Sequence, residues 1–239
     1  MHASDSSPRL GSRTWDTAGT GILLIPLGST EQHGPHLPLG TDTRVAVAVA
    51  TDLAERYRAA GAAALVAPAV EYGASGEHEG FPGTVSIGTA ALTAVLIEAA
   101  RSATRWASAV VFVNGHGGNV DAVREATVLL RSEGRDAGWV PCAVPVGEPR
   151  ADAHAGWVET SLMLHLAPED VRADRAAVGD GRSLDEILPA LRRDGVRGVA
   201  PNGVLGDPVG ASAAEGRRLF DAMCVGAWAR LQPANSVDA

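Results

Sequence analysis

The sequence predicts an α/β fold in which a mainly parallel sheet is covered by helices on both faces. Four short apolar runs of strand length alternate with longer helix-like segments along the chain. Strands that alternate with helices form parallel sheets, because each crossover helix returns the chain to the same edge of the sheet. At 239 residues the chain is long enough for one domain with a substantial core.

The first half of the chain contains three of the four predicted strands. An apolar run at 21–27 is followed by a helix at 43–60 that ends before a glycine, and then by a second strand at 63–69. Residues 70–88, rich in glycine and charge, form a long loop. A threonine caps the next helix at 89–104, and Val and Phe dominate the third strand at 108–114.

The second half continues the alternation and then becomes irregular. After a tight glycine loop at 115–118, the pattern predicts a helix at 119–133, a fourth strand at 138–144, a loop at 145–154 and a helix at 156–166 that Pro168 stops. Residues 170–211 contain many Gly and Pro residues and are expected to be irregular. A closing helix is predicted at 212–231.

The composition indicates a single domain that binds neither nucleic acid nor a membrane. We expect a flexible N-terminal arm at 1–18, one domain at 19–232 and a disordered tail at 233–239. The formal charge of -8 argues against nucleic acid as a partner. The first residues lack the apolar segment of a signal peptide, and no apolar run reaches bilayer length, so we expect a cytoplasmic protein without a membrane partner.

Good metal ligands follow the first predicted strand. Glu31 and His33 are two residues apart, a spacing that places both side chains on one side of an extended backbone, and Asp42 follows a loop rich in Pro and Gly that can turn the chain back. Carboxylate oxygens mixed with imidazole suit divalent Zn, Fe or Mn. Because α/β proteins place their sites at the carboxyl ends of strands, this loop predicts a metal-dependent hydrolase.

Two later loops add further ligands. His116 lies in a glycine turn after the third strand, and His154 and Glu159 lie after the fourth. A parallel sheet would gather these loops at one edge. We therefore expect two divalent ions, with Asp42 as the bridge. Glu31 and His116 would complete one ion's ligands, and the other's would come from His33 and Glu159. The role left to His154 is to move a proton to a leaving nitrogen.

Several of these residues also have a structural interpretation. Glu159 could merely complement the dipole of a helix start, and His154 could orient a ligand instead of moving a proton. Glu77 and His78 belong to a charged loop tip, yet either one is a candidate to contact the substrate. Trp157 is a further substrate candidate, although tryptophans most simply fill a core or a subunit interface.

Four separated runs resemble the creatininase family of amidohydrolases: GSTEQHGPHLPLGTDT, EHEGFPGT, NGHGGN and HAGWVETS. They occur in the family's order and span nearly the whole chain. The resemblance implies a three-layer α/β/α sandwich with a mainly parallel central sheet, two divalent metal ions and a hexamer or similar ring-like homo-oligomer. It also implies metal ligation by Glu31, His33, Asp42 and His116, with His154 as the proton-transfer group.

The sequence differs from creatininase proper at one expected metal ligand. Creatininase proper carries a metal-binding Glu two residues after the motif His, and this position is Gly118 here. Glu159 is our candidate replacement. The four motifs are most similar to those of the mycofactocin-system branch of the family. That branch releases a C-terminal Val-Tyr-derived dipeptide from a modified precursor peptide. The alternatives are a formamide deformylase or another small-molecule amidohydrolase of the family, and a non-catalytic metal-stabilised scaffold.

Overall fold

Four parallel strands form the centre of the fold. They are β1 (Ile22–Leu27), β2 (Ala64–Val66), β3 (Ala109–Asn114) and β4 (Ala137–Pro141), in the order β2-β1-β3-β4. In this computed structural model, which describes residues 7–232, β1 pairs with β3 along its whole length. The four predicted strands are confirmed, although β2 and β4 are shorter than predicted and β4 begins one residue before its predicted run.

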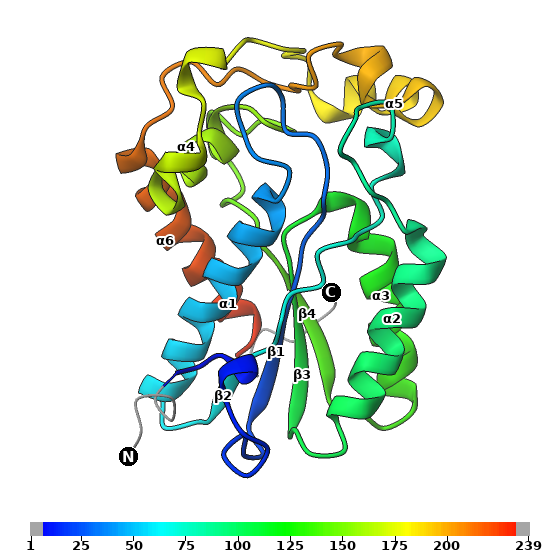
Figure 1. Cartoon of the computed structure of the whole chain (residues 1–239), viewed down its shortest axis with the longest axis vertical. Coiled ribbons are helices and arrows are strands. Elements are labelled where there is room, and N and C mark those ends of the chain that lie inside the picture. The colour runs from blue at the N-terminus through cyan, green and yellow to red at the C-terminus, as the bar shows by residue number, and fades with distance from the viewer. Residues whose placement is uncertain (1–6, 233–239) are drawn as a thin grey trace.

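Helices cover both faces of this sheet (Figure 1). α2 (Gly88–Ala103) and α3 (Val120–Ser132) pack on one face, against Leu23, Ile25 and Phe112. The other face is covered by α1 (Thr41–Ala59), α4 (Trp157–Leu166) and α6 (Ala213–Arg230), which pack against Leu24, Val111 and Val113. Successive strand residues point to opposite faces, so a sheet buried on both sides needs continuous apolar strands. The predicted three-layer α/β/α sandwich is confirmed.

The structure corrects the prediction that residues 170–211 are irregular. Helix α5 (Leu184–Val199) lies within this range, and a carboxylate oxygen of Glu186 accepts a hydrogen bond from the backbone nitrogen of Ser183 at its start, at 2.8 Å. Pro189 and Gly195 resemble helix breakers in the sequence. The element does bend at Gly195, whose φ of 66° interrupts the helical path, but packing holds both halves together.

Short 3-10 turns occupy several of the connections. They are η2 (Leu10–Ser12), η3 (Gly76–His78), η4 (Gly117–Asn119), η5 (Pro168–Asp170) and η6 (Ala173–Arg175). Two of them, η3 and η4, belong to the loops that carry predicted site residues. Within residues 7–232, the helices are too short or too polar to cross a bilayer.

Part of the predicted N-terminal arm contacts the domain. The carbonyl oxygen of Pro8 accepts a hydrogen bond from the backbone nitrogen of Val66 at 2.7 Å, and Leu10 packs against the buried side chains beneath α2 and α3. Residues 1–6 of the arm and the predicted tail at 233–239 lie outside the described residues. The domain boundaries stay a prediction.

Candidate metal centre

The predicted ligands gather above the carboxyl ends of β1 and β3. Glu31 and His33 lie in the loop after β1, His116 follows β3, and Asp42 stands in the first turn of α1. Because β1 and β3 are neighbours, the loops that follow them leave the sheet side by side. All four side chains are buried, with exposed fractions of at most 7%.

Asp42 lies between two histidines. Its Oδ1 is 3.0 Å from the Nε2 of His33, and its Oδ2 is 3.2 Å from the Nδ1 of His116. Although burial would raise the pKa of Asp42, the two imidazoles hold it well below its usual range. Burial opposes protonation of both histidines, but the neighbouring carboxylates outweigh it and raise the pKa of His33 to about 10 and that of His116 to about 9.

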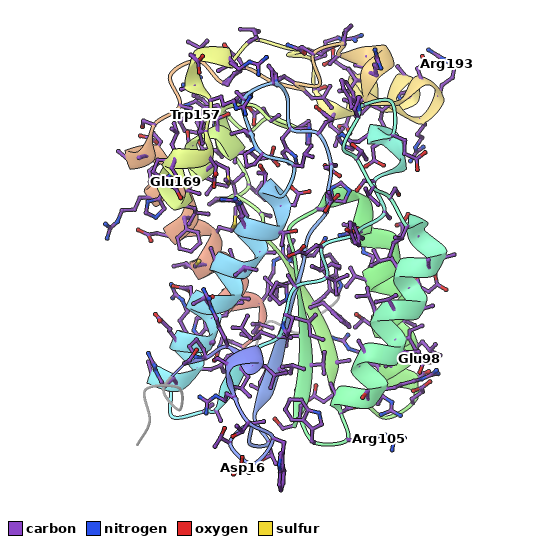
Figure 2. All side chains as sticks on the ribbon, viewed as in Figure 1. Asp16, Glu98, Arg105, Trp157, Glu169 and Arg193 are labelled. Carbon is purple, nitrogen blue, oxygen red and sulfur yellow. The ribbon has the colours of Figure 1, made fainter. Side chains whose placement is uncertain are left out.

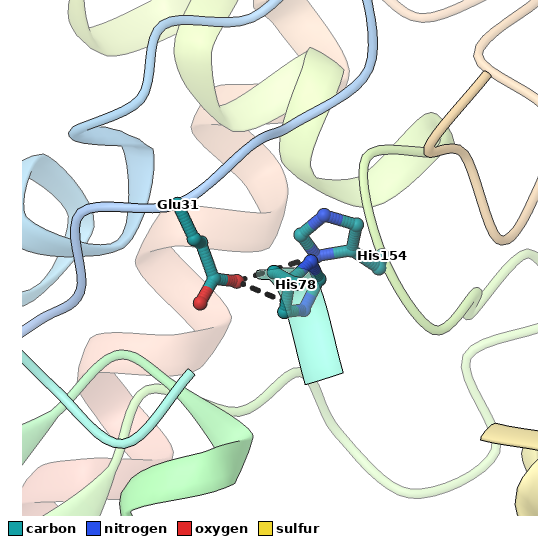
Figure 3. Close-up of side chains that lie close together, drawn as sticks. All are labelled: Glu31, His78 and His154. Carbon is teal, nitrogen blue, oxygen red and sulfur yellow. Dashed lines mark ion pairs between the residues drawn. The ribbon is translucent and has the colours of Figure 1, made fainter. Parts of the chain in front are cut away.

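Glu31 touches three histidines from a fully buried position. Its Oε2 lies 3.2 Å from the Nε2 of His116 and accepts a hydrogen bond from Ser29 at 2.8 Å. Its Oε1 faces the Nε2 of His78 at 3.3 Å and the Nδ1 of His154 at 3.8 Å, as Figure 3 shows. Burial raises the pKa of Glu31 to about 7, with a further contribution from the Asp42 carboxylate.

Glu159 reaches the same cluster from the first turn of α4. Its Oε2 lies 3.7 Å from the Nε2 of His33 and 3.9 Å from the Nδ1 of His154, and it accepts a hydrogen bond from the backbone nitrogen of Ala155 at 2.6 Å. Ala155 adopts a φ of 53°, a left-handed backbone conformation that residues other than glycine rarely take. Such backbone strain clusters at functional sites, where the surrounding structure holds it in place. Burial raises the pKa of Glu159 to about 7.

This arrangement fits divalent cations. The candidate ligands form three groups, and within each group the ligand atoms lie within 4.8 Å of one another. The groups are Glu31 with Asp42 and His116, His33 with His154 and Glu159, and Glu31 with His78 and His154. Within the described residues, the buried Glu31 Oε1 and Asp42 Oδ2 accept no hydrogen bond. Buried carboxylate oxygens that lack a well-aligned donor are costly unless a cation neutralises them. The donor set of carboxylates and imidazoles therefore fits a divalent metal of the Zn, Fe or Mn type.

The two other histidines of the cluster are held neutral. Burial lowers the pKa of His78 to about 3, with a smaller contribution from the charge of His116. Burial, followed by the charge of His33, also lowers the pKa of His154 well below its usual value. A neutral imidazole can bind a metal or accept a proton, so both proton transfer and ligation remain open to His154.

A cavity of about 770 Å³ opens above the cluster. Asp42, His116, His154 and Glu159 form its base together with Glu77 and His78. The apolar side chains of Leu184, Leu188 and Leu191 on α5 form one wall. The structure thus brings the two predicted loop-tip residues, Glu77 and His78, to the cavity.

Trp157 occupies a different place. Its ring packs in the layer between the sheet and α6, where its indole nitrogen donates to the carbonyl oxygen of Gly210 at 3.1 Å and Arg150 stacks over it. Figure 2 shows Trp157 on α4 and Arg193 on α5 at opposite sides of the upper end of the molecule. Trp157 does not reach the cavity because it lies on a different face of α4 from Glu159. Glu159 faces the site, whereas Trp157 faces the core.

Three arginines that could bind a substrate carboxylate are engaged away from the cavity. Arg44 pairs with Asp170 on the outer surface, Arg124 lies over the ring of Trp139, and Arg182 pairs with Asp180. Arg192 and Arg193 of α5 line the cavity instead. Sequence reasoning missed them because it did not predict α5.

Gln32 was also missed. Its amide lies 3.0 Å from ring nitrogens of both His78 and His154, although strict strand alternation would turn it away from Glu31 and His33. The chain is not a strand here, because it turns at Gly34, whose φ is 63°. Its place inside the Glu31-Gln32-His33 run was the only available signal.

Known proteins are similar to this chain in sequence and fold. A family profile described as "Creatininase: Creatinine amidohydrolase" matches residues 11–231. A protein of Mycolicibacterium smegmatis named mycofactocin precursor peptide peptidase is 58% identical over 212 residues, which cover 88% of this chain and 84% of that protein. A creatinine amidohydrolase of Pseudomonas putida is 33% identical over 198 residues, covering 70% and 74% of the two chains.

A solved structure described as "Creatininase Mn" superposes with a TM-score of 0.76 at 27% sequence identity. The match covers 97% of this chain and 100% of that one.

Proposed function

The chain belongs to the creatininase family, and on that premise we propose that it releases the C-terminal Val-Tyr-derived dipeptide from the modified mycofactocin precursor peptide. The reaction is hydrolysis of an amide C–N bond, which depends on divalent metal ions. The observation that carries the proposal is the buried donor set around Asp42 at the base of an open cavity. The peptide substrate is inferred from the close mycobacterial relative.

Two metal ions would be held by the residues that share Asp42. Glu31, Asp42 and His116 would hold one ion, and His33, Asp42 and Glu159 the other, because each set lies on a different side of the Asp42 carboxylate. When bound, the ions would polarise the amide carbonyl and make water acidic enough to attack at neutral pH. Zinc, iron and manganese all suit these ligands.

His154 is our candidate for proton transfer. Its Nδ1 lies 3.8 Å from Glu31 Oε1 and 3.9 Å from Glu159 Oε2, facing the base of the cavity. A neutral imidazole at this point can take a proton from water and pass it to the departing nitrogen. The low pKa of the buried ring keeps it in the neutral form that this role requires at the outset.

The wall of α5 is suited to the apolar end of the substrate. Leu184, Leu188 and Leu191 present hydrocarbon to the cavity opposite the ligands. Burial of the Val and Tyr side chains against this wall would contribute favourable free energy to substrate binding. Arg192 has no carboxylate partner within residues 7–232, so it is available for a polar group of the peptide at the rim.

The direct test incubates the metal-loaded protein with a synthetic peptide ending in Gly-Val-Tyr, preferably with the modified Val-Tyr end, and identifies the released dipeptide by mass. The Glu31→Gln variant, purified in the same way, controls for contaminating peptidases. We expect release by the wild type, loss of release after chelation, and recovery with zinc, iron or manganese. Release that persists with metal content verified near zero would overturn the proposal.

Other outcomes identify the alternatives. Turnover of a formamide without peptide cleavage would assign the protein to the deformylase class. A Glu31→Gln variant that keeps its oligomeric state, beside a wild type that hydrolyses neither substrate, would indicate a metal-stabilised scaffold. A hexamer or similar ring and a cytoplasmic location stay predictions, to be checked by light scattering and by fractionation of the host cell.

A further inference from the structure

The amide of Gln32 has a defined orientation. Its Oε1 accepts a hydrogen bond from the backbone nitrogen of Gly34 at 2.9 Å, which turns the NH₂ group toward the histidines. The Nε2 then lies 3.0 Å from each of three atoms: the carbonyl oxygen of Gly203, the Nδ1 of His78 and the Nε2 of His154. An amide nitrogen carries only two protons, so it cannot donate to all three.

His154 resolves the choice. Its Nε2 lies 2.8 Å from the backbone carbonyl oxygen of Gln32, which can only accept. The proton of a neutral His154 ring is therefore on Nε2, and this nitrogen cannot also accept from the Gln32 amide. The other nitrogen, Nδ1, keeps its lone pair, and it is the one that faces Glu31 and Glu159.

The tautomer of His78 follows from the same count. With His154 excluded as an acceptor, the two amide protons of Gln32 go to the carbonyl oxygen of Gly203 and to the Nδ1 of His78. A neutral His78 that accepts at Nδ1 carries its proton on Nε2. This nitrogen lies 3.3 Å from Glu31 Oε1, so His78 presents an N–H group where His154 presents a lone pair (Figure 3).

The segment after α5 holds this network in place. The backbone nitrogen of Leu205 donates to the carbonyl oxygen of His154 at 2.8 Å, and Gly203 supplies the carbonyl that receives one Gln32 proton. A Cβ on Gly203 would overlap the Oε1 of Gln32, and its φ of 78° also favours glycine. The amide is therefore enclosed on the side away from the histidines.

We propose that Gln32 is a positioning residue that makes His78 the hydrogen-bond donor and His154 the acceptor at the reaction centre. Both rings carry the proton on Nε2, but they face the centre with opposite nitrogens. A fixed N–H at His78 can stabilise negative charge that develops on the amide oxygen, while the bare Nδ1 of His154 remains free to accept a proton. The catalytic part of this assignment rests on the proposed hydrolysis, but the tautomers do not.

Long-range ¹H–¹⁵N NMR of the zinc-loaded protein tests the tautomers without any substrate, with signals assigned through the His78→Gln and His154→Gln variants. We expect the Nε2–H pattern for both rings in the wild type. In the Gln32→Glu variant the carboxylate cannot donate, so His78 should become protonated at Nδ1. His154 should keep its pattern because its partner is a backbone oxygen. A wild-type His78 protonated on Nδ1 would overturn the proposal even if the variant did not fold.

Gln232→Glu is the matched control, since it makes the same chemical change after the end of α6. In kinetics, we expect Gln32→Glu to lower kcat by about 10–100-fold, with KM and zinc content unchanged and no effect of the control. A merely structural role for Gln32 would instead lose zinc and disturb both ring patterns, and an unchanged His78 pattern in Gln32→Glu would equally refute the assignment. Absence of peptide turnover in the wild type would refute the proposed function but leave the NMR result intact.

Discussion

Gly118 lies so close to His116 that it leaves no room for a side chain: a Cβ built on Gly118 would stand 2.5 Å from the Nε2 of His116. It would also meet the carbonyl oxygen of Ala74, and it would be 2.9 Å from a carboxylate oxygen of Glu77. The family resemblance implies that creatininase proper carries a metal-binding Glu at this position. A carboxylate cannot enter there without displacing His116, which supports Glu159 as its replacement.

Gly118→Ala should therefore disturb the metal centre. The added methyl group must push His116 or the Ala74 backbone aside, at a cost of about 1–3 kcal/mol in unfolding free energy, and it should lower metal content. Thermal unfolding and elemental analysis measure the two effects. Gly117→Ala is the matched control, because a Cβ there has no atom within 4 Å among the described residues. Equal behaviour of the two variants would show that the site tolerates a side chain at Gly118.

Glu159→Gln tests the proposed replacement ligand. The amide keeps the size of the side chain but removes its charge, so the ion shared by His33 and Asp42 should bind more weakly. We expect kcat/KM to fall by about 10²-fold or more, together with bound metal. Glu125→Gln on the exposed side of α3 carries the same change and should match the wild type. Full metal content and full activity in Glu159→Gln would return this residue to the role of a helix-start carboxylate.

Leu188→Ala tests whether α5 receives the apolar end of the substrate. Removing this side chain from the cavity wall should raise KM by about tenfold and leave metal content unchanged. Steady-state kinetics with the peptide substrate measures the change. Val128→Ala, a truncation at a side chain that is 70% exposed on α3, is the control. A KM equal to that of the wild type would place the dipeptide elsewhere in the cavity.

Metal binding should release protons. In the metal-free protein His33 and His116 hold protons up to a pKa of about 10 and about 9, and Glu31 and Glu159 up to about 7. Metals bind the deprotonated forms, so affinity should increase as pH rises through this range. Calorimetric zinc titrations in buffers of different ionisation enthalpy count the protons, and His33→Asn should release fewer. Heats that do not depend on the buffer would contradict the prediction.

The fold was largely readable because apolar strands and amphipathic helices leave local patterns. The run at 108–114 predicted β3 closely, since a strand buried on both faces must be apolar throughout. Helix α5 was not readable in the same way. Pro189 and Gly195 disfavour a helix locally, and only its packing over the cavity, through Ile187 and Val196, compensates for them.

By itself the sequence predicted the candidate ligands and their order: Glu31, His33, Asp42, His116 and Glu159 follow strands whose parallel arrangement brings them to one edge. It could not determine which nitrogen each histidine presents to that edge. Only the tertiary structure decided that, because Gln32 acts through hydrogen bonds to His78 and to Gly203, which lie far from it in the chain. Hydrogen-bond direction depends on the relative placement of distant loops, and no local pattern records it.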